Sequence, residues 1–267
     1  MISGGSRVLV ILGDPVAHSL SPVMQNAAFQ ALGLSAVYVP LKCSADDVPP
    51  LMRAIAWGGG GGNVTVPHKE VAARTVDVCR ELAETVEACN TFWSEDGKTV
   101  GDNTDVPGLL EALHQLEVSS APWFIAGTGG GARAAVVAAV EHGVPVAVRS
   151  REPGRQRRFE TWISSRGVEL VPPAECGVLI NATPLGLHAG DPWPIEPDGF
   201  PRAEVAFDMV YAPGETAWVR AMRPGVRRAA DGRTMLVAQG AAAFERWFPS
   251  KRAPVEVMRA AVNAALR

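Results

Sequence analysis

Short apolar runs alternate with segments of helical periodicity along most of the chain. Residues 7–12 form an apolar run that ends at a Gly-Asp-Pro turn, and it predicts a buried strand that delivers a loop. Segment 21–33 then predicts a helix, with Ser21 as its N-cap and a proline at its first helical position. A second strand over 36–41 and a second helix over 45–57 repeat this order. The pattern therefore indicates an α/β arrangement for the N-terminal part.

A run of consecutive glycines, 58–62, interrupts this pattern and predicts a flexible connector with nothing to bury. Residues 63–66 then predict a strand, and 71–87 carry a helical pattern. A hairpin is expected over 88–100, and a further helix follows Asp105. Polar side chains gather at the strand ends of this stretch, where open α/β sheets bind their ligands.

From Trp123 the chain changes to repeating strand and helix units. After the first strand, the expected strands are 144–148, 169–171, 178–180 and 205–207. Parallel strands joined by right-handed crossovers follow, which is the arrangement of a doubly wound, Rossmann-like domain. The last two helical segments, 235–248 and 254–266, precede no further strand.

Two domains are therefore expected. Residues 1–105 form an N-terminal α/β domain, which is completed by C-terminal helices in 236–267 that pack back on it. Residues 106–235 form the Rossmann-like domain. This division suits the length of the chain, because 267 residues exceed the usual size of one domain.

A glycine-rich turn opens the Rossmann-like domain. Gly127, Gly129, Gly130 and Gly131 follow an apolar run and lead into an alanine-rich helix. With Ala132 they match the G-x-G-x-x-[GA] pattern, in which bare backbone lets a pyrophosphate approach the amides of a helix start. A tight αβ corner without a ligand is the alternative explanation of the same glycines.

The end of the next strand indicates which dinucleotide this turn would take. An NAD site commonly carries Asp or Glu there, to accept a hydrogen bond from the ribose 2′-hydroxyl. Here the strand ends in Arg149, Ser150 and Arg151, with Arg155 nearby. Cations and a hydroxyl suit a 2′-phosphate, so NADP is preferred. Taken by itself, the arginine cluster is also typical of a solvated helix face.

The N-terminal domain supplies candidates for chemistry. Lys69 and Asp105 follow strand ends and form a possible proton-transfer pair, in which a carboxylate would orient the lysine ammonium. Which of the two carries the proton stays open, and Asp105 is also a good helix N-cap. Ser19 and Ser21 lie at a helix start, where a carboxylate ligand is favoured. A plain capping role for Ser21, with Ser19 solvated, is the alternative.

Composition narrows the function classes. A formal net charge of −3 gives no electrostatic footprint for nucleic acid or an anionic membrane. The four cysteines form no C-x-x-C pair, so neither a metal site nor a disulfide framework is expected. No segment reaches the roughly 20 apolar residues of a membrane span, and the apolar run near the N-terminus is too short for a signal peptide. We therefore expect a cytoplasmic protein.

Motifs distributed over nearly the whole chain resemble one family. The segments GDPVAHSLSP, NVTVPHK, EACNT, GDNTDVPG, GTGGGARA, NATPLG, DMVYAPGET and DGRTMLVAQGAAAF occur in the order found in shikimate dehydrogenases. This resemblance implies NADP-dependent, reversible interconversion of shikimate and 3-dehydroshikimate on the route to aromatic amino acids. It also implies that the N-terminal domain binds the substrate and the Rossmann-like domain binds NADP.

The resemblance also assigns residues to roles. Lys69 and Asp105 would be the catalytic pair. The residues implied to bind substrate are Ser19, Ser21, Thr65, Asn90, Tyr211 and Gln239. Those implied to bind NADP are Gly127, Thr128, Gly129, Gly130, Gly131, Arg149, Ser150, Arg151, Met209 and Gly232. Without the resemblance, a buried tyrosine, a surface glutamine and a core methionine are the ordinary interpretations of Tyr211, Gln239 and Met209.

The chain departs from the family pattern at two places. Val148, Arg149 and Ser150 stand where the family usually has Asn-Arg-Thr, so cofactor preference is less firmly implied than the reaction. Thr234 stands where a glycine is usual. Two alternatives remain: a paralogue that oxidises quinate or uses NAD, and a sensor that binds nucleotide and metabolite without turnover. Either a monomer or a homodimer is compatible with the sequence.

Overall fold

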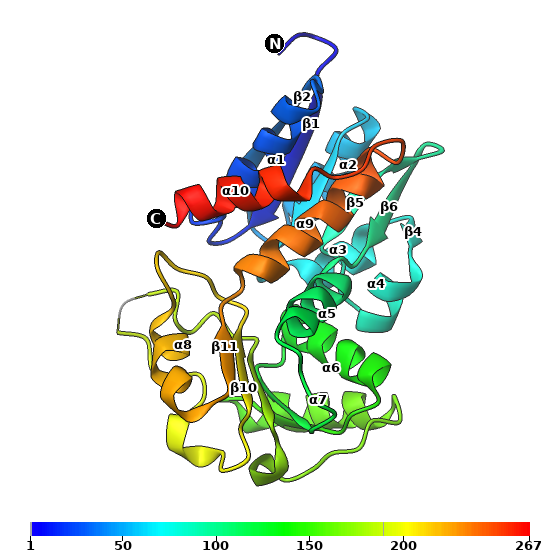
Figure 1. The fold of residues 1–267 in the computed structure, drawn as a ribbon. Coiled ribbons are helices and arrows are strands. Elements are labelled where there is room, and N and C mark those ends of the chain that lie inside the picture. Colours follow the sequence, from blue (N-terminus) through cyan, green and yellow to red (C-terminus); the bar gives the residue numbers. More distant parts are fainter. Residues whose placement is uncertain (1, 189) are drawn as a thin grey trace. The chain divides into compact units, whose positions relative to one another are not determined.

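The computed structural model describes residues 2–188 and 190–267 and divides them into two compact units (Figure 1). The first unit contains the chain up to Gly108 together with Leu236–Ala265, and the second contains Leu109–Met235. Both units are α/β. The two divisions fall inside helices α5 (Asp105–Gln115) and α9 (Arg233–Trp247), so each of these helices contributes residues to both units.

A mixed six-stranded sheet forms the centre of the first unit, in the order β2-β1-β3-β5-β6-β4. Its strands are β1 (Arg7–Gly13), β2 (Ala36–Lys42), β3 (Gly61–Val64), β4 (Val78–Cys79), β5 (Thr91–Glu95) and β6 (Lys98–Asp102). β1 runs parallel to β2 and β3, whereas β5 is antiparallel to β3 and to β6. The carboxyl ends of β1 and β3 therefore deliver their loops to the same edge of the sheet.

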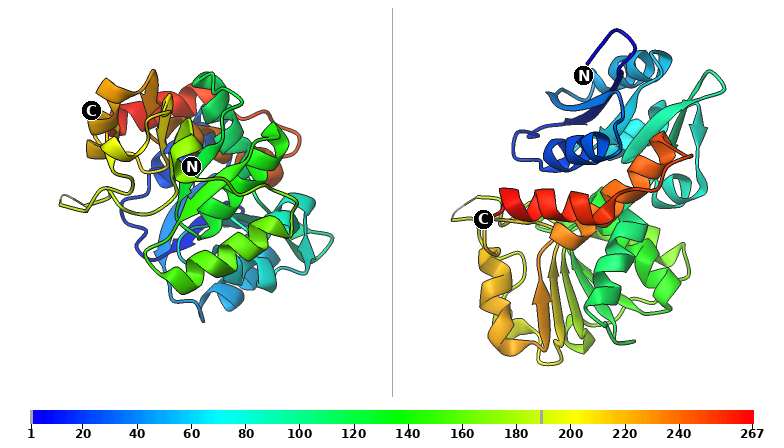
Figure 2. Two further views of the ribbon diagram at one scale, coloured as in Figure 1. Left: turned by 90° about the horizontal axis from the view of Figure 1, so that it is seen from below. Right: turned by 45° about the horizontal axis from the view of Figure 1, so that its top comes forward.

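Helices from both ends of the chain cover this sheet. They are α1 (Ser21–Ala31), α2 (Val48–Trp57), α3 (Lys69–Thr75), α4 (Glu81–Val86) and α10 (Val255–Ala265), with the C-terminal part of α9. α10 lies beside α1, as Figures 1 and 2 show. The Phe29 ring of α1 lies 6.0 Å from that of Phe244 and 5.6 Å from that of Phe248. The prediction that the C-terminal helices pack back on the first part of the chain is confirmed.

The glycine run differs from its prediction. Gly61 and Gly62 belong to β3 and are buried in the sheet. A Cβ atom on Gly62 would lie 2.3 Å from the Val10 carbonyl oxygen, and one on Gly61 would lie 2.6 Å from that of Phe92. The expected flexible connector is therefore wrong here, because these residues form an inner strand against which neighbouring backbone packs too closely for any side chain.

Tertiary pairing also overrides the helical pattern of 71–87. This stretch forms two helices, α3 and α4, separated by β4. Val78 and Cys79 of β4 pair in parallel with Val100 and Gly101 of β6, which adds an edge strand to the sheet. The strand is too short for its sequence to compete with the helical periodicity on either side, and it forms because its partner strand is available.

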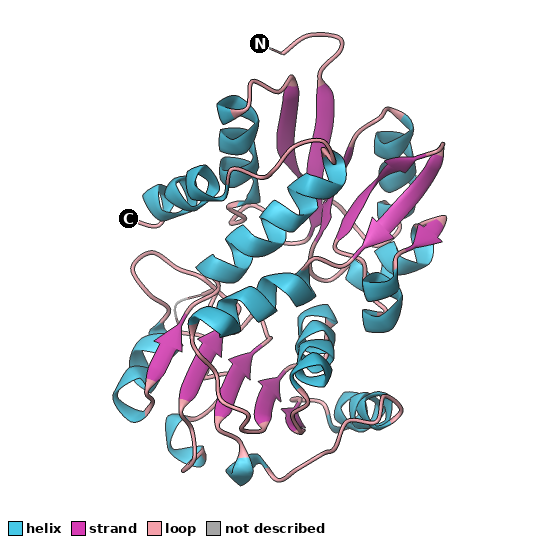
Figure 3. Cartoon of the chain, turned by 45° about the vertical axis from the view of Figure 1, so that its right-hand side comes forward, coloured by secondary structure: helices cyan, strands magenta, loops and turns pink. Residues whose placement is uncertain are grey.

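The second unit has a parallel five-stranded sheet in the order β11-β10-β9-β7-β8, and every neighbouring pair is parallel (Figure 3). Its strands are β7 (Trp123–Ala126), β8 (Val146–Arg149), β9 (Val178–Asn181), β10 (Val205–Asp208) and β11 (Arg228–Ala230). The expected strand over 169–171 is only a single bridge between Leu170 and Val146, and β11 was not predicted. Counting that bridge, the strand order is that of the Rossmann fold.

Helices α6 (Gly130–His142), α7 (Pro153–Ser164) and α8 (Ala217–Met222) pack on this sheet. α6 packs on β7, α7 on β8, and α8 on β10 and β11. In the core beside α8, the Phe124 and Phe200 rings meet edge to face at 4.5 Å, and the Trp218 indole donates a hydrogen bond to the Ile195 carbonyl at 2.9 Å. Across residues 2–188 and 190–267, none of the helices has the length and apolar character needed to cross a bilayer.

Candidate active site

Lys69 and Asp105 form an ion pair in the first unit. Lys69 is the first residue of α3 and Asp105 the first residue of α5. The Lys69 Nζ atom lies 2.5 Å from Asp105 Oδ2, and the two side chains are only 14% and 7% exposed. The other carboxylate oxygen, Oδ1, accepts a hydrogen bond from Asn90 Nδ2 at 2.8 Å. Both oxygens of Asp105 are thus fixed, and the lysine ammonium is held at a short, charge-assisted contact.

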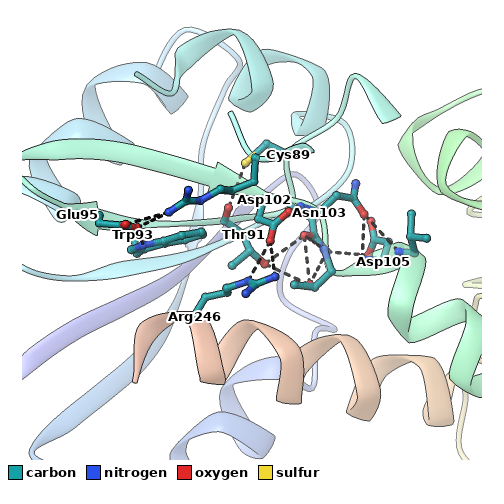
Figure 4. Close-up of polar contacts among 12 residues, drawn as sticks. Cys89, Thr91, Trp93, Glu95, Asp102, Asn103, Asp105 and Arg246 are labelled. Atoms are coloured by element: carbon teal, nitrogen blue, oxygen red, sulfur yellow. Dashed lines mark hydrogen bonds and ion pairs between the residues drawn. The ribbon is translucent and has the colours of Figure 1, made fainter. Parts of the chain in front are cut away.

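The backbone around Asp105 is fixed by two asparagines. Asn103 Oδ1 accepts hydrogen bonds from the backbone N–H groups of Asp105 at 3.0 Å and Val106 at 3.3 Å, so Asn103 satisfies the start of α5 (Figure 4). Asn90 Oδ1 accepts from the Thr104 N–H at 2.8 Å. Asp105 is therefore the first helical residue rather than the N-cap, and its carboxylate remains available to Lys69.

A buried polar network extends this arrangement into the sheet. Asn63 of β3 donates to the Asn90 carbonyl at 3.0 Å and to Thr91 Oγ1 at 2.9 Å, and it accepts from the Tyr38 hydroxyl at 2.7 Å. Thr91 in turn donates to Asn90 Oδ1 at 3.1 Å. Every one of these side chains is buried. A satisfied buried network of this kind allows a single arrangement of Asn90, and so of Asp105.

Besides Asn90, the residues implied for substrate in the first unit lie at three places. Ser19 and Ser21 are at the start of α1, but the N-cap position is Leu20, and Ser19 Oγ accepts from the Ser21 N–H at 3.3 Å. The prediction of Ser21 as the N-cap is therefore wrong, since Ser19 holds that amide. Thr65 packs against the β1 loop: its Cγ2 atom occupies the space that a Cβ on Gly13 would need. Gln239 of α9 is partly buried.

The glycine-rich turn lies between β7 and α6 in the second unit. Gly127 has φ +116°, and a Cβ there would lie 2.8 Å from the Ala182 carbonyl oxygen, so only glycine fits. Gly129 is the N-cap of α6, and a Cβ there would meet nothing within 4 Å. The turn with Thr128 and Gly130 thus presents an open backbone surface at the start of a 13-residue helix, where an anion is favoured.

Met209 and Gly232 lie together in the same unit as this turn. A Cβ on Gly131 would lie 3.1 Å from Met209 Sδ, and one on Gly232 would lie 2.3 Å from the Met209 carbonyl oxygen. The structure therefore brings the glycine turn, Met209 and Gly232 to one end of the parallel sheet. Tyr211, two residues beyond Met209, is partly buried.

The residues implied for the 2′-phosphate follow β8. Arg149 is exposed, and its guanidinium lies over the Phe124 ring at 5.2 Å from the centroid. The Ser150 N–H donates to Gln156 Oε1 at 3.1 Å, so a side chain from α7 occupies this backbone donor. Arg151 is exposed, and the nearby Arg155 pairs with Glu152 at 2.8 Å. The Phe124 ring therefore positions the Arg149 guanidinium, which takes part in none of the ion pairs found among the described residues.

Asp208 is a buried acid that the sequence did not single out. It ends β10, where Oδ1 accepts from Asn181 Nδ2 at 2.8 Å and from the Val210 N–H at 3.0 Å, and Oδ2 accepts from Thr216 Oγ1 at 2.8 Å. Burial raises the pKa of the Asp208 carboxyl group to about 6, in spite of these donors. The available signal was a polar residue at the end of an otherwise apolar strand. Its hydrogen bonds fix the segment that carries Met209.

No role was predicted for Asn63, Thr91 and Asn103, although each lies in one of the segments that resemble the family. Asn63 and Thr91 pair across neighbouring strands, so their own segments held no signal for these contacts. Asn103 holds amides two and three residues ahead, and an asparagine just before a helix was an available local signal. Within the described ranges, no cluster of three or more His, Cys, Asp or Glu residues could hold a metal ion. The four cysteines are free thiols.

Comparison with known proteins adds independent findings. Residues 11–92 match the model of the shikimate dehydrogenase substrate binding domain, and residues 232–262 match that of the shikimate 5′-dehydrogenase C-terminal domain. The chain is 40% identical to a shikimate dehydrogenase (NADP(+)) of Methanothrix thermoacetophila, with 97% of this chain and 98% of that protein covered. It is 36% identical to one from a Synechococcus species, with 99% and 96% covered.

A solved structure shows the same similarity. Shikimate 5-dehydrogenase from Thermus thermophilus, in complex with NADP(H) and shikimate, superposes with a TM-score of 0.86 at 32% identity, and 99% of this chain and 100% of that chain are covered.

Proposed function

Because the chain belongs to the shikimate dehydrogenase family, we propose that it catalyses the reversible, NADP-dependent interconversion of shikimate and 3-dehydroshikimate. The observation that carries this proposal is the nearly buried ion pair of Lys69 and Asp105, with both carboxylate oxygens fixed. Such a pair suits a reaction in which an alcohol loses a proton as it is oxidised.

Lys69 and Asp105 act on the substrate hydroxyl in this mechanism. In the oxidation direction the pair accepts the hydroxyl proton, and in the reduction direction it returns that proton to the forming alkoxide. Asp105 keeps the Lys69 ammonium oriented, and Asn90 keeps Asp105 from turning away from it. NADP, when bound, accepts or supplies the hydride. Because the pair is shielded from water, its charges act at close range in a medium of low polarity.

We assign NADP binding to the second unit, because the backbone there fits the group. At Gly127 there is no room for a Cβ, and at Gly129 the backbone is open to its surroundings. Both glycines lie at the start of α6. Thr128, Gly130 and Gly131 complete the pyrophosphate site. Arg149, Ser150 and Arg151 are proposed for the 2′-phosphate, and Met209 and Gly232 for the nicotinamide.

Substrate binding is assigned mainly to the first unit. Ser19 and Ser21 are proposed to hold the substrate carboxylate at the start of α1. The remaining oxygens of the substrate are assigned to Thr65, Asn90 and Gln239. Tyr211 is proposed as a further substrate ligand. The four free cysteines suit a reducing compartment, so we propose that the enzyme is cytoplasmic. A monomer or a homodimer is proposed for its oligomeric state.

One set of rate measurements tests the function. Initial rates of NADP and NAD reduction are measured with shikimate and with quinate, for the parent and for Lys69→Ala. We expect shikimate with NADP to be fastest, and the variant to lose about 1,000-fold in kcat because the proton-transfer group is gone. Lys98→Ala, at an exposed lysine of β6, is the matched control.

Two outcomes would contradict the proposal. A preference for quinate or for NAD would instead support the paralogue. Saturable binding of both ligands without turnover in any combination would leave only the sensor.

A further inference from the structure

The carboxylate of Asp102 is buried three residues before Asp105, and the mechanism does not use it. Its side chain is 3% exposed. Arg246, from helix α9, reaches it with two nitrogens, since Nε and Nη2 both lie 2.9 Å from Asp102 Oδ2 (Figure 4). The sequence positions of the two residues differ by 144. A buried carboxylate at the end of β6 is thus matched by a cation from the far end of the chain.

Asp102 accepts hydrogen bonds from both asparagines that hold Asp105. Asp102 Oδ1 accepts from the Asn103 N–H at 2.8 Å, and Asn103 holds the backbone of Asp105. The Asp102 carbonyl accepts from the Asn90 N–H at 3.1 Å, and Asn90 holds the carboxylate of Asp105. The position of Asp102 therefore sets that of both asparagines.

Anchoring α9 to the sheet does not require Arg246. The neighbouring Trp247 is buried and donates to the Phe92 carbonyl at 3.1 Å, and Phe244 packs on Phe29. A buried charge is also a poor source of stability, because desolvation offsets the attraction between the two ions. Arg246 follows Gln239 by about two helical turns, so the helix that carries a proposed substrate ligand is tied to the loop of the catalytic acid.

We propose that Arg246 is a positioning residue for Asp105 and acts through Asp102 and the two asparagines. The proposal rests on the proposed function, because it requires Asp105 to work with Lys69. Arg246 neutralises Asp102, holds it in one orientation and thereby keeps the Asp105 carboxylate within reach of Lys69. Removing Arg246 leaves a buried carboxylate without its cation, and the turn between β6 and α5 moves to solvate it.

Steady-state kinetics of Arg246→Leu test this inference. We expect kcat for shikimate oxidation to fall about tenfold, because a displacement of well under 1 Å at the proton-transfer pair is enough for such a loss. KM for NADP should stay within about twofold of the parent value. Arg246→Lys should recover most of kcat, because it restores one charged donor. Arg252→Leu removes a 94% exposed arginine that follows α9 and is the matched control.

A double-mutant cycle separates positioning from mere stability. In the Asp105→Asn background Arg246→Leu should cause no further loss of rate, because the group it positions is gone. An equal loss in both backgrounds, or a kcat of Arg246→Leu within about twofold of the parent, would overturn the inference. If Arg246→Leu does not fold, Asp102→Asn takes its place under the same criteria. Absence of turnover in the parent would instead refute the proposed function.

Discussion

Replacing Asp208 by Asn should remove a pH dependence from the free energy of unfolding. Burial raises the pKa of this carboxyl group to about 6 from an ordinary value of 3.8. Between these two values the folded protein keeps a proton that the unfolded chain has released. The contribution of Asp208 to the stability of the parent therefore falls as the pH rises through this window, and this contribution is lowest above about pH 6.

The size of the effect follows from the two pKa values. A difference of about two units corresponds to about 3 kcal/mol of unfolding free energy. About 2 kcal/mol of this loss in unfolding free energy occurs between roughly pH 4.5 and pH 7.5. The amide introduced by Asp208→Asn would keep an oxygen for the donors from Asn181 and Val210 and lose the acceptor for Thr216, which adds an offset that does not vary with pH.

Urea unfolding of the parent and of Asp208→Asn across this pH range gives the measurement. The quantity to follow is the difference in unfolding free energy between the two proteins, because all other titrating groups cancel in it. We expect the variant to gain about 2 kcal/mol relative to the parent from the acidic to the neutral end. Asp198→Asn, at an exposed position, controls for the change in net charge. A difference constant within about 0.5 kcal/mol would refute the reasoning.

Three further predictions concern other parts of the molecule. Gly62→Ala should destabilise the protein by about 3 kcal/mol in urea unfolding because its Cβ would meet strand backbone, whereas Gly4→Ala, in open space, should be neutral; equal effects would contradict this. Gln156→Ala frees a backbone donor beside the proposed 2′-phosphate site, so KM for NADP should fall roughly fivefold relative to that for NAD, and an unchanged ratio would speak against that site. Burial raises the pKa of the Cys89 thiol to about 12, so disulfide reagents followed by peptide mass spectrometry should label the less buried Cys79 first, and the opposite order would contradict the burial of Cys89.

Local signals were sufficient for most of the fold. The apolar runs that became β7, β9 and β10 are buried along their whole length, and that of β1 is buried from Leu9 onward. Their shortness and the turn residues beside them indicated strands and not helices. The glycine turn needed only its own residues, because Gly127 has a backbone conformation that few other residues adopt. Lys69 and Asp105 were found for a related reason, since strand ends deliver polar side chains to one edge of a sheet.

Long-range contacts decide what the sequence did not predict. Gly61 and Gly62 resemble a linker until the strands beside them are known. Asn63 has its partners on other strands, and nothing in its own neighbourhood separates it from a surface polar residue. The same is true of Arg246, whose helix position alone suggests solvent.

The return of α9 and α10 to the first unit constrains how the protein is made. The strands around β1 are synthesised before the second unit, yet residues that cover their sheet, such as Trp247 and Phe244, are synthesised after it. The segment between them carries the sheet of the second unit and the helices that pack on it, α6, α7 and α8. The second unit can therefore fold before α9 and α10 are made, whereas the first unit keeps apolar surface exposed until they are made. Loss of chaperones and premature termination should therefore affect the folding of the first unit, which carries Lys69 and Asp105.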